Sequence, residues 1–150
     1  MNLFRVMEIS GSALLAERLR AEIVTANLAN AETTRTEKGG PYQRMHVVFG
    51  ARPSQSGSGP GSFGTMLASF ADLHAEEVRV VNVVADQAAP IRRFEPGNPD
   101  ADTQGYVAYP AINPAEEMVN LMGAARAYEI NVSAVTSTKA MIQSAIGLLS

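Results

Sequence analysis

The fold is decided by residues 114–149, whose sequence is PAEEMVNLMGAARAYEINVSAVTSTKAMIQSAIGLL. Read at heptad spacing, this stretch places nine apolar side chains and one lysine on a single stripe, which consists of Met118, Leu121, Ala125, Tyr128, Val132, Val135, Lys139, Ile142, Ile146 and Leu149. Such a stripe, sustained over about five repeats, is typical of a coiled-coil helix. At about 1.5 Å per residue the helix is expected to be roughly 54 Å long, and a partner must cover its stripe.

The beginning of this helix is marked by its first residues. Asn113 is of a type that caps helices, and Pro114 suits the first helical position because its ring fixes φ near the helical value. Glu116 and Glu117 follow in the first turn, where the positive end of the helix dipole favours carboxylates. No proline follows Pro114, so we expect one continuous helix.

A second helix is expected over residues 8–30, which lack proline and consist mostly of helix-forming residues. Its heptad stripe is Ile9, Ser12, Ala16, Leu19, Ile23, Ala26 and Asn30. Several of these side chains are small, so a larger helix can approach closely. We therefore expect the first and last helices to pair as a coiled coil, in a discontinuous helical domain formed by residues 1–30 and 113–150.

The middle of the chain, residues 31–112, has a different composition. It contains seven of the eight prolines and nine of the twelve glycines, which favours turns and short strands. Residues 50–64 are a Gly/Ser-rich stretch that we interpret as a flexible linker. A short helix is expected at 65–77, and strands are expected at 42–49, 77–85, 91–94 and 105–109. The fold class is thus mainly α, with a small β-rich outer module inserted between the long terminal helices.

Composition excludes several classes of function. The net charge is −3 and no basic run exceeds Arg92-Arg93, so a nucleic-acid partner is not expected. The absence of cysteine excludes disulfides and thiolate metal sites. The first residues lack the apolar core of a cleaved secretory signal, and the apolar run at 78–84 is too short to span a membrane.

The motifs that resemble catalytic or binding sites each lack an essential part. GPGSFG at 59–64 has dinucleotide-type glycine spacing, but a linker rather than a strand precedes it. DADTQG at 100–105 begins like a calcium loop, but it lacks the glutamate required at the twelfth position, so we interpret it as a hairpin turn. His74 and Glu76 have the spacing of a zinc deaminase without its cysteines, and His46 stands alone. We therefore expect no enzymatic activity, no catalytic residue, no cofactor and no metal.

Asn27 and Asn30 lie three residues apart where the first helix is expected to end. Asparagine is common at helix ends because its side chain bonds to freed backbone groups. An ordinary C-cap accounts for one asparagine but not for two. We expect the pair to turn the chain out of the helix.

The segment VTANLANAETT at 24–34 resembles the N-terminal signature of bacterial flagellar rod and hook proteins. Further stretches narrow the resemblance to the basal-body rod proteins of the proximal rod: ISGSA at 9–13, TTRTEKGGPY at 33–42, PGNPDAD at 96–102 with GYV at 105–107, and EEMVN at 116–120 with ARAY at 125–128. These stretches occur in order and cover both ends of the chain. Residues 52–76 depart from the family pattern and resemble an enlarged variable segment.

The resemblance implies a structural component of the rod, the drive shaft that crosses the periplasm and transmits torque. It implies assembly with itself, with rod proteins of the FlgB and FlgF kinds and with distal rod proteins, after passage through the flagellar type III export apparatus without signal cleavage. The expected assembly interface consists of Ile9, Ala16, Leu19, Ile23, Asn27, Asn30, Met118, Leu121, Ala125, Tyr128, Val132, Val135, Ile142 and Ile146. An alternative is a soluble coiled-coil adaptor or export chaperone that binds one partner without polymerising.

Overall fold

The computed structural model describes residues 3–51 and 77–148. Along these residues the elements are α1 (Leu3–Ala29), β1 (Met45–Ala51), β2 (Val78–Ala85), β3 (Ile91–Phe94), β4 (Tyr106–Tyr109) and α3 (Pro114–Gly147). The strands form two separate two-stranded antiparallel sheets, β1–β2 and β3–β4. The protein is therefore mainly helical with small antiparallel sheets, which confirms the predicted fold class at this level.

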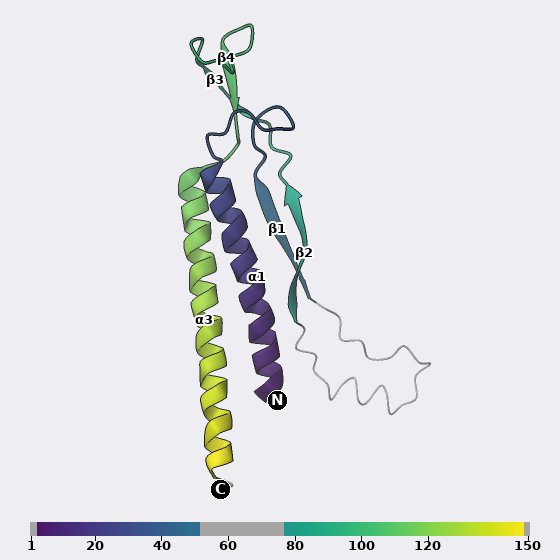
Figure 1. The fold of residues 1–150 in the computed structure, drawn as a ribbon, viewed down its shortest axis with the longest axis vertical. Coiled ribbons are helices and arrows are strands. Elements are labelled where there is room, and N and C mark those ends of the chain that lie inside the picture. Colours follow the sequence, from purple (N-terminus) through teal and green to yellow (C-terminus); the bar gives the residue numbers. More distant parts are fainter. Residues whose placement is uncertain (1–2, 52–76, 149–150) are drawn as a thin grey trace, which may run out of the picture.

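The molecule is elongated, with α1 and α3 lying side by side in opposite directions (Figure 1). The β1–β2 ribbon runs along α1 on the side away from α3, and the β3–β4 hairpin lies beyond the end where α1 stops and α3 begins. Both termini lie at the opposite end of the molecule. In the described part of the chain, neither helix has the length and apolar character needed to cross a membrane.

The helix α1 begins at Leu3, five residues before the predicted start at residue 8. The earlier start follows from the sequence of residues 3–7, LFRVM, which contains no glycine or proline to prevent helix formation. Gly11 is accommodated inside the helix. The predicted start was wrong because residues 3–7 were left out of the helix although they contain no helix-breaking residue.

Small and polar side chains form most of the buried surface of the two helices. On α1 the buried residues are Ser10, Ala16, Val24 and Asn27, and on α3 they are Glu117, Ala124 and Thr138. The residues buried on α3 each precede a member of the predicted stripe, namely Met118, Ala125 and Lys139. The face that α3 turns toward α1 is therefore offset toward these residues, and of the predicted stripe only Leu121, Val135 and Ile142 remain half-buried within the described residues.

The offset has a physical cause in the composition of α3. Residues 118–148 contain only three charged side chains, Arg126, Glu129 and Lys139, so apolar residues occur all around the helix. Hydrophobic spacing alone cannot decide which of several apolar stripes faces α1. Small residues allow the two backbones to approach closely, and the larger side chains lie on the outer surface.

The β1–β2 ribbon is attached to α1 at both of its ends. The Ser12 hydroxyl accepts a hydrogen bond from the Val78 N–H at 3.2 Å, where β2 begins. Asn27 bonds to the backbone of Met45, where β1 begins. The fifteen residues from Ser12 to Asn27 span about 22 Å of helix, and the six steps from Met45 to Ala51 span about 20 Å of strand. The ribbon and the helix therefore match in length.

The observed strands agree with the predicted ones to within a few residues. β3 has the predicted bounds, β2 and β4 each begin one residue later, and β1 runs from Met45 to Ala51 instead of from 42 to 49. The predicted short helix at 65–77 and most of the linker at 50–64 fall in 52–76, outside the described residues.

The β3–β4 hairpin is held by an aromatic contact and a glycine. Phe94 and Tyr106 lie directly opposite each other, with ring centroids 5.3 Å apart in an edge-to-face arrangement. Gly105 precedes Tyr106 with a φ of 80°, in the left-handed region that side chains disfavour. A Cβ atom on Gly105 would also lie 2.9 Å from Cε2 of Phe94, so this position requires glycine.

We predict that Gly105→Ala destabilises the protein by roughly 1–3 kcal/mol, because it combines an unfavourable φ with a clash against Phe94. The free energy of unfolding in urea measures the effect. Gly97→Ala is the matched control, since a Cβ there meets no atom within 4 Å. Equal stability of the two variants would contradict the proposed strain.

Candidate functional site: a buried polar junction and an apolar helix surface

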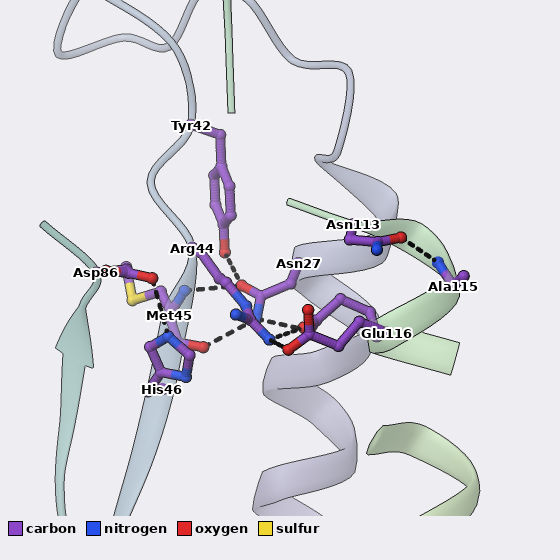
Figure 2. A network of polar contacts seen from close by, with 10 residues as sticks. Asn27, Tyr42, Arg44, Met45, His46, Asp86, Asn113, Ala115 and Glu116 are labelled. Atoms are coloured by element: carbon purple, nitrogen blue, oxygen red, sulfur yellow. Dashed lines mark hydrogen bonds and ion pairs between the residues drawn. The ribbon is translucent and has the colours of Figure 1, made fainter. Parts of the chain in front are cut away.

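Asn27 lies at the centre of a polar cluster that joins α1, β1 and α3 (Figure 2). Its Nδ2 donates to the Met45 carbonyl at 2.8 Å and to Oε2 of Glu117 at 3.0 Å. Its Oδ1 accepts from the Met45 N–H at 2.9 Å and from the Tyr42 hydroxyl at 3.1 Å. The side chain is only 1% exposed and uses both of its donors and both acceptor positions of its oxygen. An amide is the side chain type that can make all four bonds.

Glu117 is the second member of this cluster and is also 1% exposed. Arg44, just before β1, donates through Nη2 to Oε1 of Glu117 and, at 3.2 Å, to Oε1 of the more exposed Glu116. Glu117 also lies in the first turn of α3, where the helix dipole favours its charge. We call Asn27, Tyr42, Arg44 and Glu117 the polar junction.

The charges of the polar junction stabilise one another. Burial disfavours the charge on Arg44, but the hydrogen bonds and attraction of Glu117 and Glu116 raise the pKa of the guanidinium above its usual value. Burial, followed by the negative charge of Glu117, also raises the pKa of the Tyr42 phenol. Tyr42 is therefore a neutral hydrogen-bond donor at physiological pH, and Arg44 remains charged.

Asn30 has a different role from Asn27. Its Nδ2 donates to the Ala26 carbonyl at 2.9 Å, and its Oδ1 accepts from the Thr33 hydroxyl at 3.1 Å. These bonds end the helix and turn the chain, as predicted for the pair, but only Asn30 of the two has this role. Asn27 instead joins segments that are distant in the sequence. This role was not predicted from the sequence, and neither were the role of Arg44 and the burial of Glu117. The only signal in the sequence was the family resemblance, whose motifs at 24–34 and 116–120 contain Asn27 and Glu117.

The start of α3 agrees with the sequence prediction. The Asn113 side chain accepts from the Ala115 N–H at 3.1 Å, and Pro114 occupies the first helical turn. The carboxylates of the first turn are Glu116 and Glu117. The capping residue thus places Glu117 where Arg44 and Asn27 can reach it.

The expected assembly residues divide into three groups by exposure. Ala16 and Asn27 are buried, at 3% and 1% exposure. The half-buried group is Ile9, Leu19, Ile23, Asn30, Leu121, Val135 and Ile142. The exposed group is Met118, Ala125, Tyr128, Val132 and Ile146. The structure of one chain thus brings the first two groups toward its interior and leaves the third on its surface.

The outer surface of α3 carries exposed large apolar side chains in two stretches, 118–132 and 141–148. Its exposed large apolar residues are Met118, Val119, Met122, Tyr128, Ile130, Val132, Met141, Ile146 and Leu148, each at least 41% exposed. With only three charged residues between 118 and 148, this surface lacks the usual charged cover of a solvent-facing helix. We call these nine residues the outer α3 surface.

The remaining candidate motifs have structural roles where the structure describes them. The carboxylate of Asp102 accepts from the Gln104 and Tyr106 N–H groups and from Arg92, so it forms the turn between β3 and β4. His46 lies 3.2 Å from Asp86. Within residues 3–51 and 77–148, His, Asp and Glu side chains do not gather in threes as a metal site requires. His74 lies outside the described residues.

Comparison with known families gives two matches, one at each end of the chain. Residues 7–35 match the family described as "Flagella basal body rod protein". Residues 103–148 match the family described as "Flagellar basal body rod FlgEFG protein C-terminal". The matched regions contain most of α1, all of α3 and β4.

Relatives with curated names match over almost the whole chain. The flagellar basal-body rod protein FlgC of Borreliella burgdorferi is 34% identical over 154 residues, covering 99% of each chain. FlgC of Salmonella typhimurium is 35% identical over 95% of this chain and 94% of its own. FlgC of Bacillus subtilis is 33% identical over 97% of both chains.

The chain belongs to the FlgC family of flagellar basal-body rod proteins. This confirms the resemblance to the rod proteins that the sequence motifs indicate. In this FlgC-family chain, Asn27 lies in the N-terminal matched region and Glu117 in the C-terminal one. The polar junction therefore joins the two regions that identify the family, and Tyr42 and Arg44 connect them from the segment between.

We predict that Asn27→Ala is much more destabilising than Asn30→Ala. Removal of the Asn27 amide takes a hydrogen bond from the buried carboxylate of Glu117 and from part-buried backbone groups of Met45, at roughly 1–3 kcal/mol for each group left unsatisfied. Asn30→Ala removes only the local bonds that cap the helix, so it should lower the free energy of unfolding by about 1 kcal/mol. Urea unfolding of both single variants measures the difference, and equal losses would contradict the central position of Asn27.

We predict strong coupling between Arg44 and Glu117. Arg44→Met leaves the buried Glu117 carboxylate without its cation and should lower the free energy of unfolding by about 3–5 kcal/mol. Adding Glu117→Gln removes the unpaired charge, so the double variant should recover part of this loss. Arg44→Lys is the matched control, because a single nitrogen of Arg44 contacts both carboxylates and an ammonium can replace it. A double-mutant cycle in urea measures the coupling, and additive losses would show that the two side chains act separately.

Proposed function

We propose that this chain is a structural subunit of the flagellar basal-body rod, where it assembles with itself and with other rod proteins through its two long helices. The outer α3 surface carries this proposal. It extends along a helix of 34 residues, about 51 Å in length. Apolar side chains spread over such a distance are typical of a surface that another protein covers.

The names of the relatives support a rod protein over the alternative of a soluble adaptor or export chaperone. The FlgC proteins of three distant bacteria are named basal-body rod proteins and match this chain over 94–99% of their own length. A structural role needs no catalytic group. It needs many packed contacts along the helices, so that torque is shared among them.

We infer that α1 and α3 pair as a coiled coil, in a discontinuous domain of residues 1–30 and 113–150. The spacing of the buried α3 residues supports this pairing, because Glu117, Ala124 and Thr138 are separated by seven and fourteen positions. Residues 31–112 form the outer module in this arrangement. The helix pair then lies in the inner layer of the rod.

The exposed assembly residues supply contacts between subunits, and the buried ones hold the helix pair together. Proximal rod proteins of the FlgB and FlgF kinds and distal rod proteins are the neighbours that the family resemblance favours. The same resemblance favours delivery through the flagellar type III export apparatus without signal cleavage. A repeated contact between different surfaces of neighbouring subunits does not close, so it produces a helical rod.

We predict that Val132→Asp abolishes incorporation into the rod and leaves the folded chain intact. Val132 is 41% exposed in the single chain, so a charge there meets water until a neighbouring subunit covers it. Circular dichroism of the purified variant and immunoblots of isolated basal bodies measure the two effects. Ser133→Asp is the matched control, since it adds the same charge at an exposed polar position.

Two outcomes would contradict the proposal. Normal motility and normal incorporation of Val132→Asp would show that the outer α3 surface is not covered in the rod. Recovery of the unmodified chain only from the cytoplasm, with none in purified basal bodies, would favour the adaptor or chaperone.

A further inference from the structure

Three methionines give the outer α3 surface a reactivity that its aliphatic members lack. Met118, Met122 and Met141 are 55%, 63% and 51% exposed, and they are three of the nine residues that define this surface. The chain contains no cysteine, so all of its sulfur atoms belong to methionine thioethers. Mild oxidants convert an accessible thioether to a sulfoxide, which replaces an apolar group with a polar one.

The three thioethers are distributed over both apolar stretches of α3. Met118 and Met122 lie four residues apart, so they are neighbours on the same side of the helix. Met141 is the first exposed apolar residue of the second stretch, 141–148. Oxidation of these residues would therefore place polar groups in each stretch.

The side of α3 that contacts α1 is built from other residue types. Its buried residues are Glu117, Ala124 and Thr138, and none of the half-buried residues of α3 is a methionine. Sulfoxides on the outer side thus leave the contact with α1 and the polar junction unchanged. Oxidation is expected to alter the surface of the folded chain without unfolding it.

We propose that Met118, Met122 and Met141 form a site of reversible oxidation at which hydrogen peroxide blocks assembly of the folded chain. A lone pair of each Sδ attacks one peroxide oxygen, the S–O bond forms as the O–O bond breaks, and the other oxygen leaves as water. The thioether loses two electrons and the peroxide gains them. Methionine sulfoxide reductases, with thiols as the reductant, return the sulfoxide to the thioether.

The effect on assembly follows from the polarity of the sulfoxide. A neighbouring subunit that covers this surface would remove the sulfoxide oxygen from water without a bond to replace its hydration. The same neighbour shields the thioethers once a subunit is incorporated, so oxidation acts on chains that have not yet assembled. This inference rests on the proposed function, since it needs the outer α3 surface to be covered in the rod.

Peroxide treatment of the purified chain tests whether fold and surface respond separately. Peptide mass spectrometry should find one added oxygen atom on each of Met118, Met122 and Met141, and circular dichroism should show an unchanged helical signal. Loss of the helical signal with oxidation, or thioethers that stay unoxidised, would overturn the proposal.

Incorporation in cells tests the effect on assembly. Cells without methionine sulfoxide reductases express either the natural chain or the variant with Met118→Leu, Met122→Leu and Met141→Leu, and they receive hydrogen peroxide while new flagella form. The measured quantity is the amount of chain in isolated basal bodies with peroxide divided by the amount without it. Because each strain is compared with itself, any effect of leucine on unstressed assembly cancels. The ratio should fall several-fold for the natural chain and stay nearly constant for the variant.

Met45→Leu is the matched control. Met45 is 37% exposed, but it lies on β1 and its bonds to Asn27 come from its backbone. This variant should therefore lose incorporation under peroxide as strongly as the natural chain does. If the triple variant does not assemble, the single variant Met122→Leu replaces it and should reduce the loss in part.

The outcomes separate this inference from the proposed function. Equal loss of the natural and leucine chains, or undiminished incorporation of the natural chain under peroxide, overturns the oxidation site and leaves the rod assignment in place. Absence of the untreated natural chain from basal bodies overturns both.

Discussion

The buried ion pair between Arg44 and Glu117 is the interaction on which the arrangement of this protein depends. Two charges removed from water lose their hydration, and they are stable only if their positions and hydrogen bonds are fixed. Asn27 supplies the remaining bond to Glu117 and also holds the first residue of β1. One cluster therefore determines how α1, β1 and α3 meet.

The polar junction also sets the register of the helix pair. Elsewhere the contact between α1 and α3 involves small residues such as Ser10, Ala16 and Ala124, which would tolerate sliding of one helix along the other. A shift by one turn, about 5.4 Å, would separate Glu117 from both Arg44 and Asn27. Close packing brings the helices together, and the buried charges select one alignment.

This arrangement assigns different tasks to the two sides of α3. The inner side is small and partly polar, and it fits a single neighbour, α1. The outer side carries exposed large apolar residues over 118–132 and 141–148, and in the proposed rod these residues contact other subunits. In the proposed rod, a helix with ordinary amphipathic spacing could not contact a neighbour on both sides, and this accounts for the scarcity of charge in α3.

Much of the fold could be predicted from local sequence features, because those features act locally. Asn113 and Pro114 mark the start of α3, and the proline- and glycine-rich middle predicts short strands and turns. The buried role of Glu117 could not be predicted, since its partners Asn27 and Arg44 lie 90 and 73 residues away in the sequence. The face of α3 that contacts α1 could not be predicted either, because hydrophobic spacing does not distinguish among several apolar stripes on one helix.

The pairing of the first helix with the last has a consequence for the timing of folding. Contacts between residues far apart in sequence form slowly, because the chain between them must first lose its freedom. α1 is synthesised well before α3, the 34-residue helix that packs against it. Before α3 is synthesised, α1 can contact only the β1–β2 ribbon, and the polar junction lacks Glu117. The order of elements along the chain thus delays the native state until α3 has been synthesised.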